Sequence, residues 1–171
     1  LIGCVARYSP QKDHVNLLEA FKGYIENDET AMLILVGDGM NQDNQMLRSL
    51  LAYYELENRV ILAGQFDDIS PVMSGLDVHV LPSAFGEAFP NVLCEAIACG
   101  TICVATNVGD VPHIIEDTRL VCEPRDHDQL KDVIANAFTL NTVEYRMKSR
   151  ERIVKKYSIQ VMVDSYSDVW F

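Results

Sequence analysis

Two glutamates, Glu87 and Glu95, enclose seven residues in the stretch SAFGEAFPNVLCEAIACG, directly after the apolar run DVHVLP. The pattern predicts a buried strand, a loop and then a helix that starts at Pro90, since proline is tolerated in a first helical turn. The amides of Asn91 and Val92 would point at an anion above the strand, because the first turn of a helix leaves its amides without internal partners. The chemistry that this junction favours is the binding of phosphate.

The two carboxylates need a different role from the amides. A nearby negative charge gains only about 0.3–1 kcal/mol at a helix start, and a carboxylate there would compete with phosphate. Carboxylates accept hydrogen bonds from vicinal hydroxyls, so Glu95 could bind one sugar and Glu87 another, with phosphates between them. A nucleotide sugar has that layout. The alternative is that both glutamates are solvated surface charges, the usual state of a glutamate on a helix.

Two cations follow the first apolar run of the chain. Arg7 and Lys12 bracket the segment RYSPQK after IGCVA, and the carboxyl ends of strands are where open α/β sheets bind ligands. Together they could neutralise a diphosphate, with arginine as a planar fork and lysine as a mobile point charge. Each cation taken alone is more commonly a solvated loop charge.

The elements that must position these residues alternate along the chain. Apolar runs are followed by amphipathic segments, which predicts an α/β fold with parallel strands joined by right-handed helical crossovers. The expected architecture is a doubly wound, Rossmann-like parallel sheet with helices on both faces. Strands are expected at 2–6, 31–36, 60–62, 77–81, 102–105 and 120–122. Helices are expected after Asp13, through 46–51, at 69–73, from Pro90, and at 128–138, 143–157 and 159–170.

Composition limits the classes of function. A chain of 171 residues suits about one domain, and no apolar run reaches the roughly 18 residues of a membrane span. The net charge of −11 argues against binding nucleic acid through the bulk surface. Basic residues gather in the stretch 146–156, where a solvated helix face is expected and contact with an anionic membrane surface is the alternative.

Cysteine and histidine spacing does not predict a metal site. The five cysteines have no CxxC pair and the four histidines are scattered. The cysteines are therefore interpreted as small hydrophobic residues of a protein in the reducing cytoplasm.

With these residues assembled, the chain resembles the carboxy-terminal, donor-binding domain of family 4 glycosyltransferases (glycosyltransferase group 1), which have the two-domain GT-B fold. The resemblance covers nearly the whole chain. Its most specific part is the glutamate pair with seven intervening residues, the EX7E motif, followed by Ala96 and Gly100. The matching segments are VARYSPQKD, ILVGDG, VILAGQFDD, DVHVLPSAFGEAFPNVLCEAIACG and ATNVGDVPHII.

The resemblance implies a role for each site residue. Arg7 and Lys12 would bind the donor diphosphate and stabilise the leaving nucleotide, Glu87 would contact the donor sugar, and Glu95 would bind the ribose hydroxyls. Arg7, Lys12 and Glu87 would thus be the catalytic residues. The further donor-binding residues would be Phe89, Pro90, Asn91 and Val92 beside the phosphates and sugar, and Gly64, Phe66 and Asp68 where relatives place the nucleobase.

The resemblance also implies a reaction and a context. The sugar would be transferred from a nucleotide-diphosphate sugar with retention of configuration, without metal or cofactor, because protein cations and amides take the electrostatic role. Such enzymes make polysaccharides or glycolipids, and this one is expected in the cytoplasm, with peripheral attachment to the inner face of the membrane as an option. Nucleobase, donor sugar, acceptor, linkage and oligomeric state are left open.

The expected domain organisation has a consequence for activity. Residues 1–171 are interpreted as one donor-binding domain with terminal helices from about 126, and the acceptor-binding amino-terminal domain is absent. Catalysis in this fold occurs in a cleft between two domains. The chain is therefore expected to bind nucleotide or nucleotide sugar weakly, to transfer nothing alone, and to self-associate through surfaces meant for its partner domain.

The chain departs from the family pattern at three places. Ala6 stands where a glycine commonly precedes the arginine, and His14 follows Asp13 where a glycine after the lysine is frequent. The segment 116–120 lacks the glycine usual before the last strand, so the length of that turn is expected to differ from the family pattern, without a consequence for the site.

Other classes of function remain open at this point. One is a nucleotide-sugar epimerase or hydrolase of the GT-B fold, and another is a noncatalytic nucleotide-binding module. A dehydrogenase has weaker support, because Gly37-Asp38-Gly39 is followed by Met40-Asn41-Gln42 and lacks the third glycine or alanine of a dinucleotide fingerprint.

Overall fold

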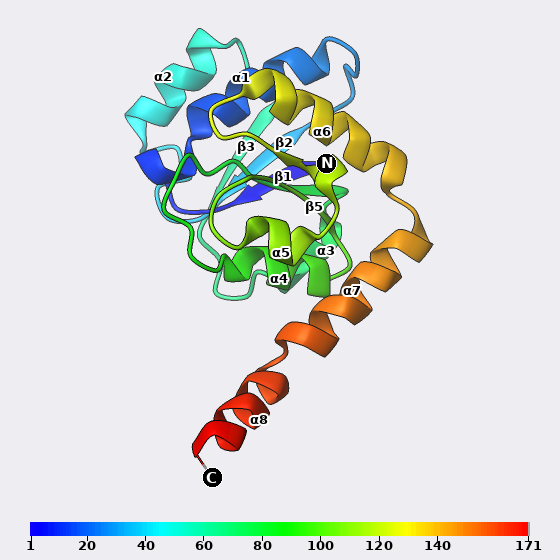
Figure 1. Cartoon of the computed structure of the whole chain (residues 1–171). Coiled ribbons are helices and arrows are strands. Elements are labelled where there is room, and N and C mark those ends of the chain that lie inside the picture. Colours follow the sequence, from blue (N-terminus) through cyan, green and yellow to red (C-terminus); the bar gives the residue numbers. More distant parts are fainter. Residues whose placement is uncertain (171) are drawn as a thin grey trace.

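One six-stranded parallel sheet forms the centre of the molecule in the computed structural model, which describes residues 1–170 (Figure 1). The strand order is β3-β2-β1-β4-β5-β6, so the direction of winding reverses between β1 and β4. This is the doubly wound, Rossmann-like architecture predicted from the sequence. The strands are β1 (Ile2–Val5), β2 (Leu33–Val36), β3 (Val60–Gly64), β4 (Val78–Leu81), β5 (Ile102–Thr106) and β6 (Val121–Cys122).

Helices cover both faces of the sheet. Helices α1 and α6 pack against each other on one face, while α3, α4 and α5 lie on the other (Figure 1). The helices are α1 (His14–Ile25), α2 (Gln45–Tyr53), α3 (Ser70–Gly75), α4 (Asn91–Ala98), α5 (Val111–Ile115), α6 (His127–Leu140), α7 (Val143–Tyr157) and α8 (Ile159–Trp170). Short 3-10 turns occupy Pro10–Lys12 and Thr118–Leu120.

The predicted elements are all present, with ends that differ by at most two residues. Helix α5 was not predicted, because a five-residue helix that opens with Val111-Pro112 is too short to show a helical period. Helix α4 begins at Asn91 rather than at Pro90, which caps it in an extended conformation.

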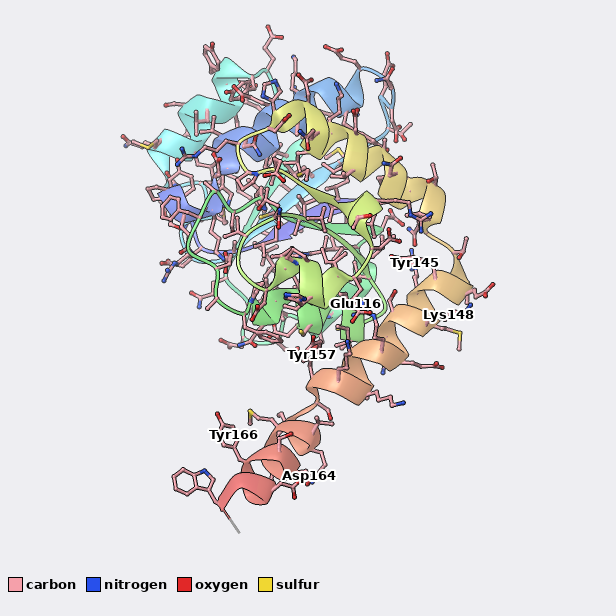
Figure 2. All side chains as sticks on the ribbon, viewed as in Figure 1. Glu116, Tyr145, Lys148, Tyr157, Asp164 and Tyr166 are labelled. Carbon is pink, nitrogen blue, oxygen red and sulfur yellow. The ribbon has the colours of Figure 1, made fainter. Side chains whose placement is uncertain are left out.

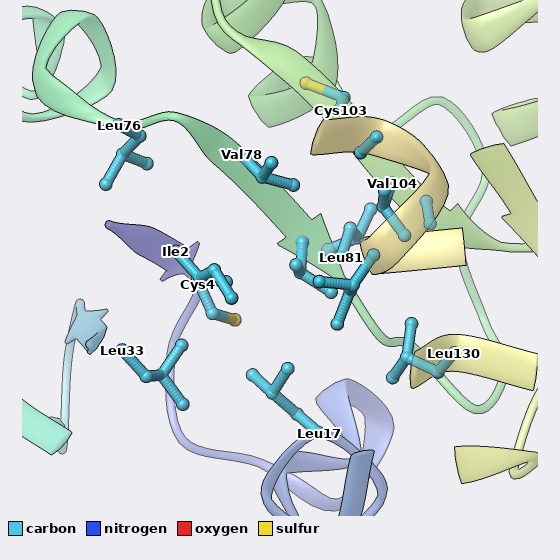
Figure 3. Packing of buried hydrophobic residues seen from close by; sticks show 14 of the residues in the cluster. Ile2, Cys4, Leu17, Leu33, Leu76, Val78, Leu81, Cys103, Val104 and Leu130 are labelled. Atoms are coloured by element: carbon cyan, nitrogen blue, oxygen red, sulfur yellow. The ribbon is translucent and has the colours of Figure 1, made fainter. Parts of the chain in front are cut away.

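The core explains why the cysteines behave as apolar residues. Cys4 of β1 lies between Ile2, Leu33 and Leu17 of α1 in the packed face of the sheet (Figure 3). Burial raises the pKa of the Cys4 thiol to about 12 and also raises that of Cys103. These thiols stay protonated at neutral pH, as the sequence interpretation required.

Strands β1 and β4 separate towards their carboxyl ends. Their pairing covers Ile2 with Val78 and Gly3 with His79. Beyond that point the amide of Val5 donates to Nε2 of His79 at 3.4 Å, so a side chain takes the place of a ladder carbonyl. The gap lies where the strand order reverses, which is the ligand position in open α/β sheets.

The basic stretch of α7 docks that helix on the domain. Arg152 donates to the carbonyls of Ile114 and Ile115 at 2.6 and 3.1 Å, and Arg150 donates to the carbonyl of Ala98. These carbonyls end α5 and α4, where cations are favoured by the helix dipole. The prediction of a solvated basic face on α7 is therefore only partly correct, because these two arginines bind carbonyls of the same chain.

In the turn before β6, a residue other than glycine adopts the left-handed conformation. Glu116 ends α5 in the left-handed conformation, with φ at 60°. Its carboxylate contacts Nζ of Lys156 at 2.5 Å and Nε of Arg152 at 3.6 Å. The side chain of this left-handed residue thus ties the turn to α7.

Helix α8 projects away from the rest of the molecule (Figures 1 and 2). Large apolar side chains on it are exposed, including Ile159, Met162, Tyr166 and Trp170. Within residues 1–170, no helix has both the length and the apolar character needed to cross a membrane.

Candidate functional site

Two loops that are 75 residues apart in sequence meet above the gap between β1 and β4. The loop after β1 carries Arg7 and Lys12, and the loop after β4 carries Glu87. Nζ of Lys12 contacts Oε1 of Glu87, and both side chains are largely buried, with exposures of 14% and 8%. The structure therefore brings the predicted lysine and the first predicted glutamate together.

Gln11 fastens the same two loops to each other. Its side-chain amide donates to the backbone carbonyl of Gly86 at 2.9 Å, and its backbone carbonyl accepts from the amide of Ala84 at 2.8 Å. Nη2 of Arg7 lies 3.5 Å from Oε1 of Gln11, with the rest of Arg7 exposed. Both cations consequently lie on the side of the molecule where α4 begins.

Glu87 is held from several directions. Oγ of Ser83 donates to Oε1 of Glu87 at 2.6 Å, in addition to the contact from Lys12. A Cβ built on Gly109, whose φ is +59°, would lie 1.9 Å from the carbonyl oxygen of Glu87. The amide of Asp110 donates to the carbonyl of Ala88 at 2.9 Å, which closes the loop against the segment after β5. Glu87 is thus a fixed carboxylate and not a solvated surface charge.

The start of α4 matches most of its predicted geometry. Leu93, Ala96 and Ile97 are buried against the sheet, whereas Asn91 and Glu95 are exposed. Glu95 therefore points away from the core into solvent. Val92, which helical spacing also places on the apolar face, is only half-buried.

Two predicted donor-binding segments have additional structural contacts. The ring of Phe89 packs edge-on against Tyr157 of α7, with 5.2 Å between ring centroids. The segment from Gly64 to Asp68 begins at the last residue of β3, a strand that lies two positions away from β1 in the sheet. There Phe66 is exposed, and Oδ1 of Asp68 accepts from the amide of Ser70 at the start of α3.

Two histidines lie beneath the loops. His79 is fully buried and its Nδ1 has no hydrogen-bond partner in the described part of the chain, and both ring nitrogens of the buried His14 are in the same situation. Burial, with a smaller contribution from the charge of Lys12, lowers the pKa of His79 to about 3 and that of His14 to about 4. Both rings are therefore neutral at physiological pH.

We expect these histidines to make folding sensitive to mild acid. In the unfolded chain each would have a pKa of about 6.5, so below that value the unfolded state binds protons that the folded state does not. The unfolding free energy should therefore fall as the pH drops through 6.5 towards the folded-state values, by about 2 kcal/mol per histidine between pH 7 and 5. Carboxylates contribute little above pH 5 because their ordinary pKa values are about 4.

Urea denaturation at pH 7, 6 and 5 checks this expectation. Replacing His79 with phenylalanine should remove about half of the pH dependence, whereas His113→Gln, at an exposed position, should leave it unchanged. Equal unfolding free energies for the parent protein at pH 7 and pH 5 would contradict the assignment of neutral, buried rings.

Sequence reasoning did not identify Gln11, Ser83, Thr106 and Gly109 as parts of the site. The signal for Gly109 was available, because a glycine directly after a buried strand indicates a tight turn or close backbone contact. The other three are polar residues whose roles depend on contacts between distant segments. Within residues 1–170, no group of three or more histidine, cysteine, aspartate or glutamate side chains is arranged to hold a metal ion.

Comparison with known protein families shows to which family the chain belongs. Residues 1–157 match the family described as "Glycosyl transferases group 1". The chain belongs to this family. Membership agrees with the observed sheet order and with the meeting of the two loops at its point of reversal, although the comparison does not assign a role to any single residue.

Individual relatives of this glycosyltransferase domain share about a quarter of its sequence. The chain is 27% identical to the N-acetyl-alpha-D-glucosaminyl L-malate synthase of Bacillus anthracis and to an alpha-1,3-galactosyltransferase of Escherichia coli, matching 98% and 97% of this chain. It superimposes on Anabaena Alr3699/HepE, solved in complex with UDP, with a TM-score of 0.87 and 24% identity over 98% of this chain and 47% of that one. The chain spans 44% of the length of the two curated relatives.

Proposed function

We propose that this domain binds the nucleotide-diphosphate sugar of a retaining glycosyltransferase of family 4 with the GT-B fold. The observation that carries the proposal is the contact of Lys12 with Glu87 above the gap between β1 and β4. It places a cation and a fixed carboxylate at the sheet edge where open α/β folds bind nucleotides.

Each group has a chemical task in this proposal. Lys12 and Arg7 neutralise the diphosphate, and the amides of Asn91 and Val92 add hydrogen bonds from the start of α4. Glu87 accepts from hydroxyls of the donor sugar, and Glu95 accepts from the ribose. Departure of the nucleoside diphosphate is the step that needs charge stabilisation, so the cations contribute more than a general base would.

Two comparisons support this assignment. The chain belongs to the group 1 glycosyltransferases, and Anabaena Alr3699/HepE, which has the same fold, was solved with UDP and with UDP-glucose. The names of relatives include transferases that act on very different acceptors, from L-malate to a diphosphoundecaprenol-linked sugar. The names of these relatives therefore do not identify the acceptor of this protein.

A second, acceptor-binding domain completes the enzyme in this proposal. The chain spans less than half of the curated relatives that match 98% and 97% of it, and α8 exposes an apolar surface formed by Ile159, Met162, Tyr166 and Trp170. Burial of this surface on the other domain would remove apolar area from water and bring the acceptor over Glu87. The isolated domain should bind donor without transferring sugar.

A thermal-shift panel tests the proposed function. The ligands are UDP, ADP, GDP, UDP-glucose, UDP-N-acetylglucosamine, ADP-glucose and GDP-mannose, with NAD and inorganic phosphate as controls. A ligand at about 100 times its dissociation constant adds about 2.7 kcal/mol, which should raise the melting temperature by about 5–11 °C. At least one diphosphate and its sugar conjugate should do so. No response to any of them, or a response to NAD alone, would refute the proposal.

The same samples distinguish the alternative enzymes. An epimerase or hydrolase would release a new sugar nucleotide or free sugar without any acceptor, which chromatography of the incubated mixture would detect. The donor-binding domain should return its nucleotide sugar unchanged.

A further inference from the structure

Ser83 lies at the base of the loop that carries Glu87. It is the second residue after β4 and is fully buried. Its Oγ donates to Oε1 of Glu87 at 2.6 Å, and Nζ of Lys12 contacts this same oxygen. Because both donors bind Oε1, Oε2 is the oxygen of Glu87 that remains for a ligand hydroxyl.

Ser83 is itself fixed to the sheet. Thr106, the last residue of β5, is also fully buried, and its Oγ1 donates to the carbonyl of Ser83 at 2.5 Å. The part of the loop beyond Ser83 is much more open, with Phe85 and Phe89 half and about two-fifths exposed. The hydroxyl of Ser83 therefore offers Glu87 a buried anchor that is tied to β5, whereas Phe85 and Phe89 beyond it in the loop are exposed.

Lys12 divides its ammonium between Glu87 and the diphosphate when a donor is bound in the proposed function. The ammonium has three N–H donors and can contact both groups, but the negative charge of the phosphates draws it away from Glu87. A serine hydroxyl is uncharged and has one proton to donate, so it is a far weaker partner for phosphate than an ammonium. The contact from Ser83 can persist when Lys12 turns to the ligand.

We propose that Ser83 is a positioning residue that keeps the carboxylate of Glu87 directed at the donor sugar while Lys12 binds the diphosphate. This inference rests on the proposed function, because it assigns the task of Glu87 to the sugar. It predicts a specific loss: without the hydroxyl, the affinity for the sugar conjugate should fall, while the affinity for the nucleoside diphosphate should not.

Isothermal titration of the domain with matched ligand pairs tests the inference. The pairs are UDP with UDP-glucose or UDP-N-acetylglucosamine, ADP with ADP-glucose, and GDP with GDP-mannose, and the measured quantity is the ratio of the two dissociation constants. Ser83→Ala should reduce the preference for the sugar conjugate about tenfold, the cost expected for one hydrogen bond to a charged group. Ser49→Ala, at an exposed serine of α2, should not change it.

A double-mutant cycle separates positioning from general damage. Glu87→Ala should reduce the sugar preference, and adding Ser83→Ala to that variant should reduce it no further, because the serine acts through the glutamate. Melting temperatures of all variants identify any that have lost the fold. Additive losses in the double variant, an unchanged preference in Ser83→Ala, or equal losses for diphosphate and conjugate would each overturn the inference.

Failure of the proposed function would give a different result. In that case the parent protein would bind none of the diphosphates, or Glu87→Ala would leave the sugar preference unaltered. Normal diphosphate binding together with a Glu87-dependent preference that ignores Ser83 would overturn the positioning role alone.

Discussion

Lys12→Ala is expected to weaken the binding of every nucleoside diphosphate about 100-fold and to lower the unfolding free energy by about 3 kcal/mol. The first effect follows because the ammonium of Lys12 contacts Glu87 above the gap between β1 and β4, where the diphosphate is proposed to bind. The second follows because Glu87 is only 8% exposed and would lose its charged partner. A buried charge without a partner is costly, whereas the complete pair is close to neutral for stability.

The two effects can be separated by a second substitution. In Lys12→Ala/Glu87→Ala the uncompensated carboxylate is gone, so urea denaturation should show most of the stability restored, while titration should still show weak diphosphate binding. Lys22→Ala is the matched control, because Lys22 pairs with the largely exposed Glu55 at 3.1 Å and lies outside the site. Diphosphate binding equal to that of the parent protein in Lys12→Ala would show that the lysine has no part in the site.

Gly109→Ala is expected to lower the unfolding free energy by about 3 kcal/mol and to abolish detectable binding of nucleotide sugars. A methyl group at this position would lie 1.9 Å from the carbonyl oxygen of Glu87, so backbone must move. The φ of +59° adds strain, because side chains disfavour the left-handed region. Relief of the clash would displace the backbone at Glu87 and Ala88 that leads into α4, and with it both Glu87 and the amides proposed to bind the phosphates.

Gly75→Ala provides the comparison for Gly109→Ala. Gly75 ends α3, and a Cβ there would meet no atom within 4 Å. Its substitution should change the unfolding free energy by less than about 1 kcal/mol and leave ligand binding intact. Urea denaturation and calorimetric titration of both variants make the comparison. Intact sugar-nucleotide binding in Gly109→Ala would contradict the tight contact with Glu87.

The regular elements were predictable because each is encoded locally. Four-residue apolar runs such as Leu33–Val36 and the amphipathic pattern of α7 indicate their own conformation. The alternation of strands and helices then indicates parallel pairing. Helix α5 escaped prediction because its five residues contain little more than one turn, and its start depends on the close contact of Gly109 with the loop before α4.

The site was predictable in outline and not in detail. Arg7, Lys12, Glu87 and Glu95 are charged residues next to the carboxyl ends of strands or at a helix start, and such positions are readable from sequence. The pairing of Lys12 with Glu87, and the support from Ser83 and Gln11, depend on loops 75 residues apart. No local pattern encodes which oxygen of a carboxylate two distant donors will share.

The basic stretch of α7 is present as predicted, but only part of it forms a solvated helix face. Its cations are concentrated as the sequence suggested, yet Arg150 and Arg152 bind the carbonyls that end α4 and α5. Those carbonyls lie more than 35 residues earlier in the chain, so only the fold brings them within reach. The same contacts explain why α7 stays on the body of the domain while α8 leaves it.

The most direct test of the account is a titration of the ¹⁵N-labelled domain with its tightest nucleoside diphosphate, followed by amide chemical shifts. We expect the amides of residues 7–12 and 87–95 to shift with a common dissociation constant, and those of 64–68 to follow if the nucleobase lies there. The proposed location of the diphosphate would be contradicted if the amides of residues 7–12 and 87–95 did not shift. Shifts would then be confined to another surface, such as the groove beside α2 that is lined by Gln42, Arg48 and Glu57.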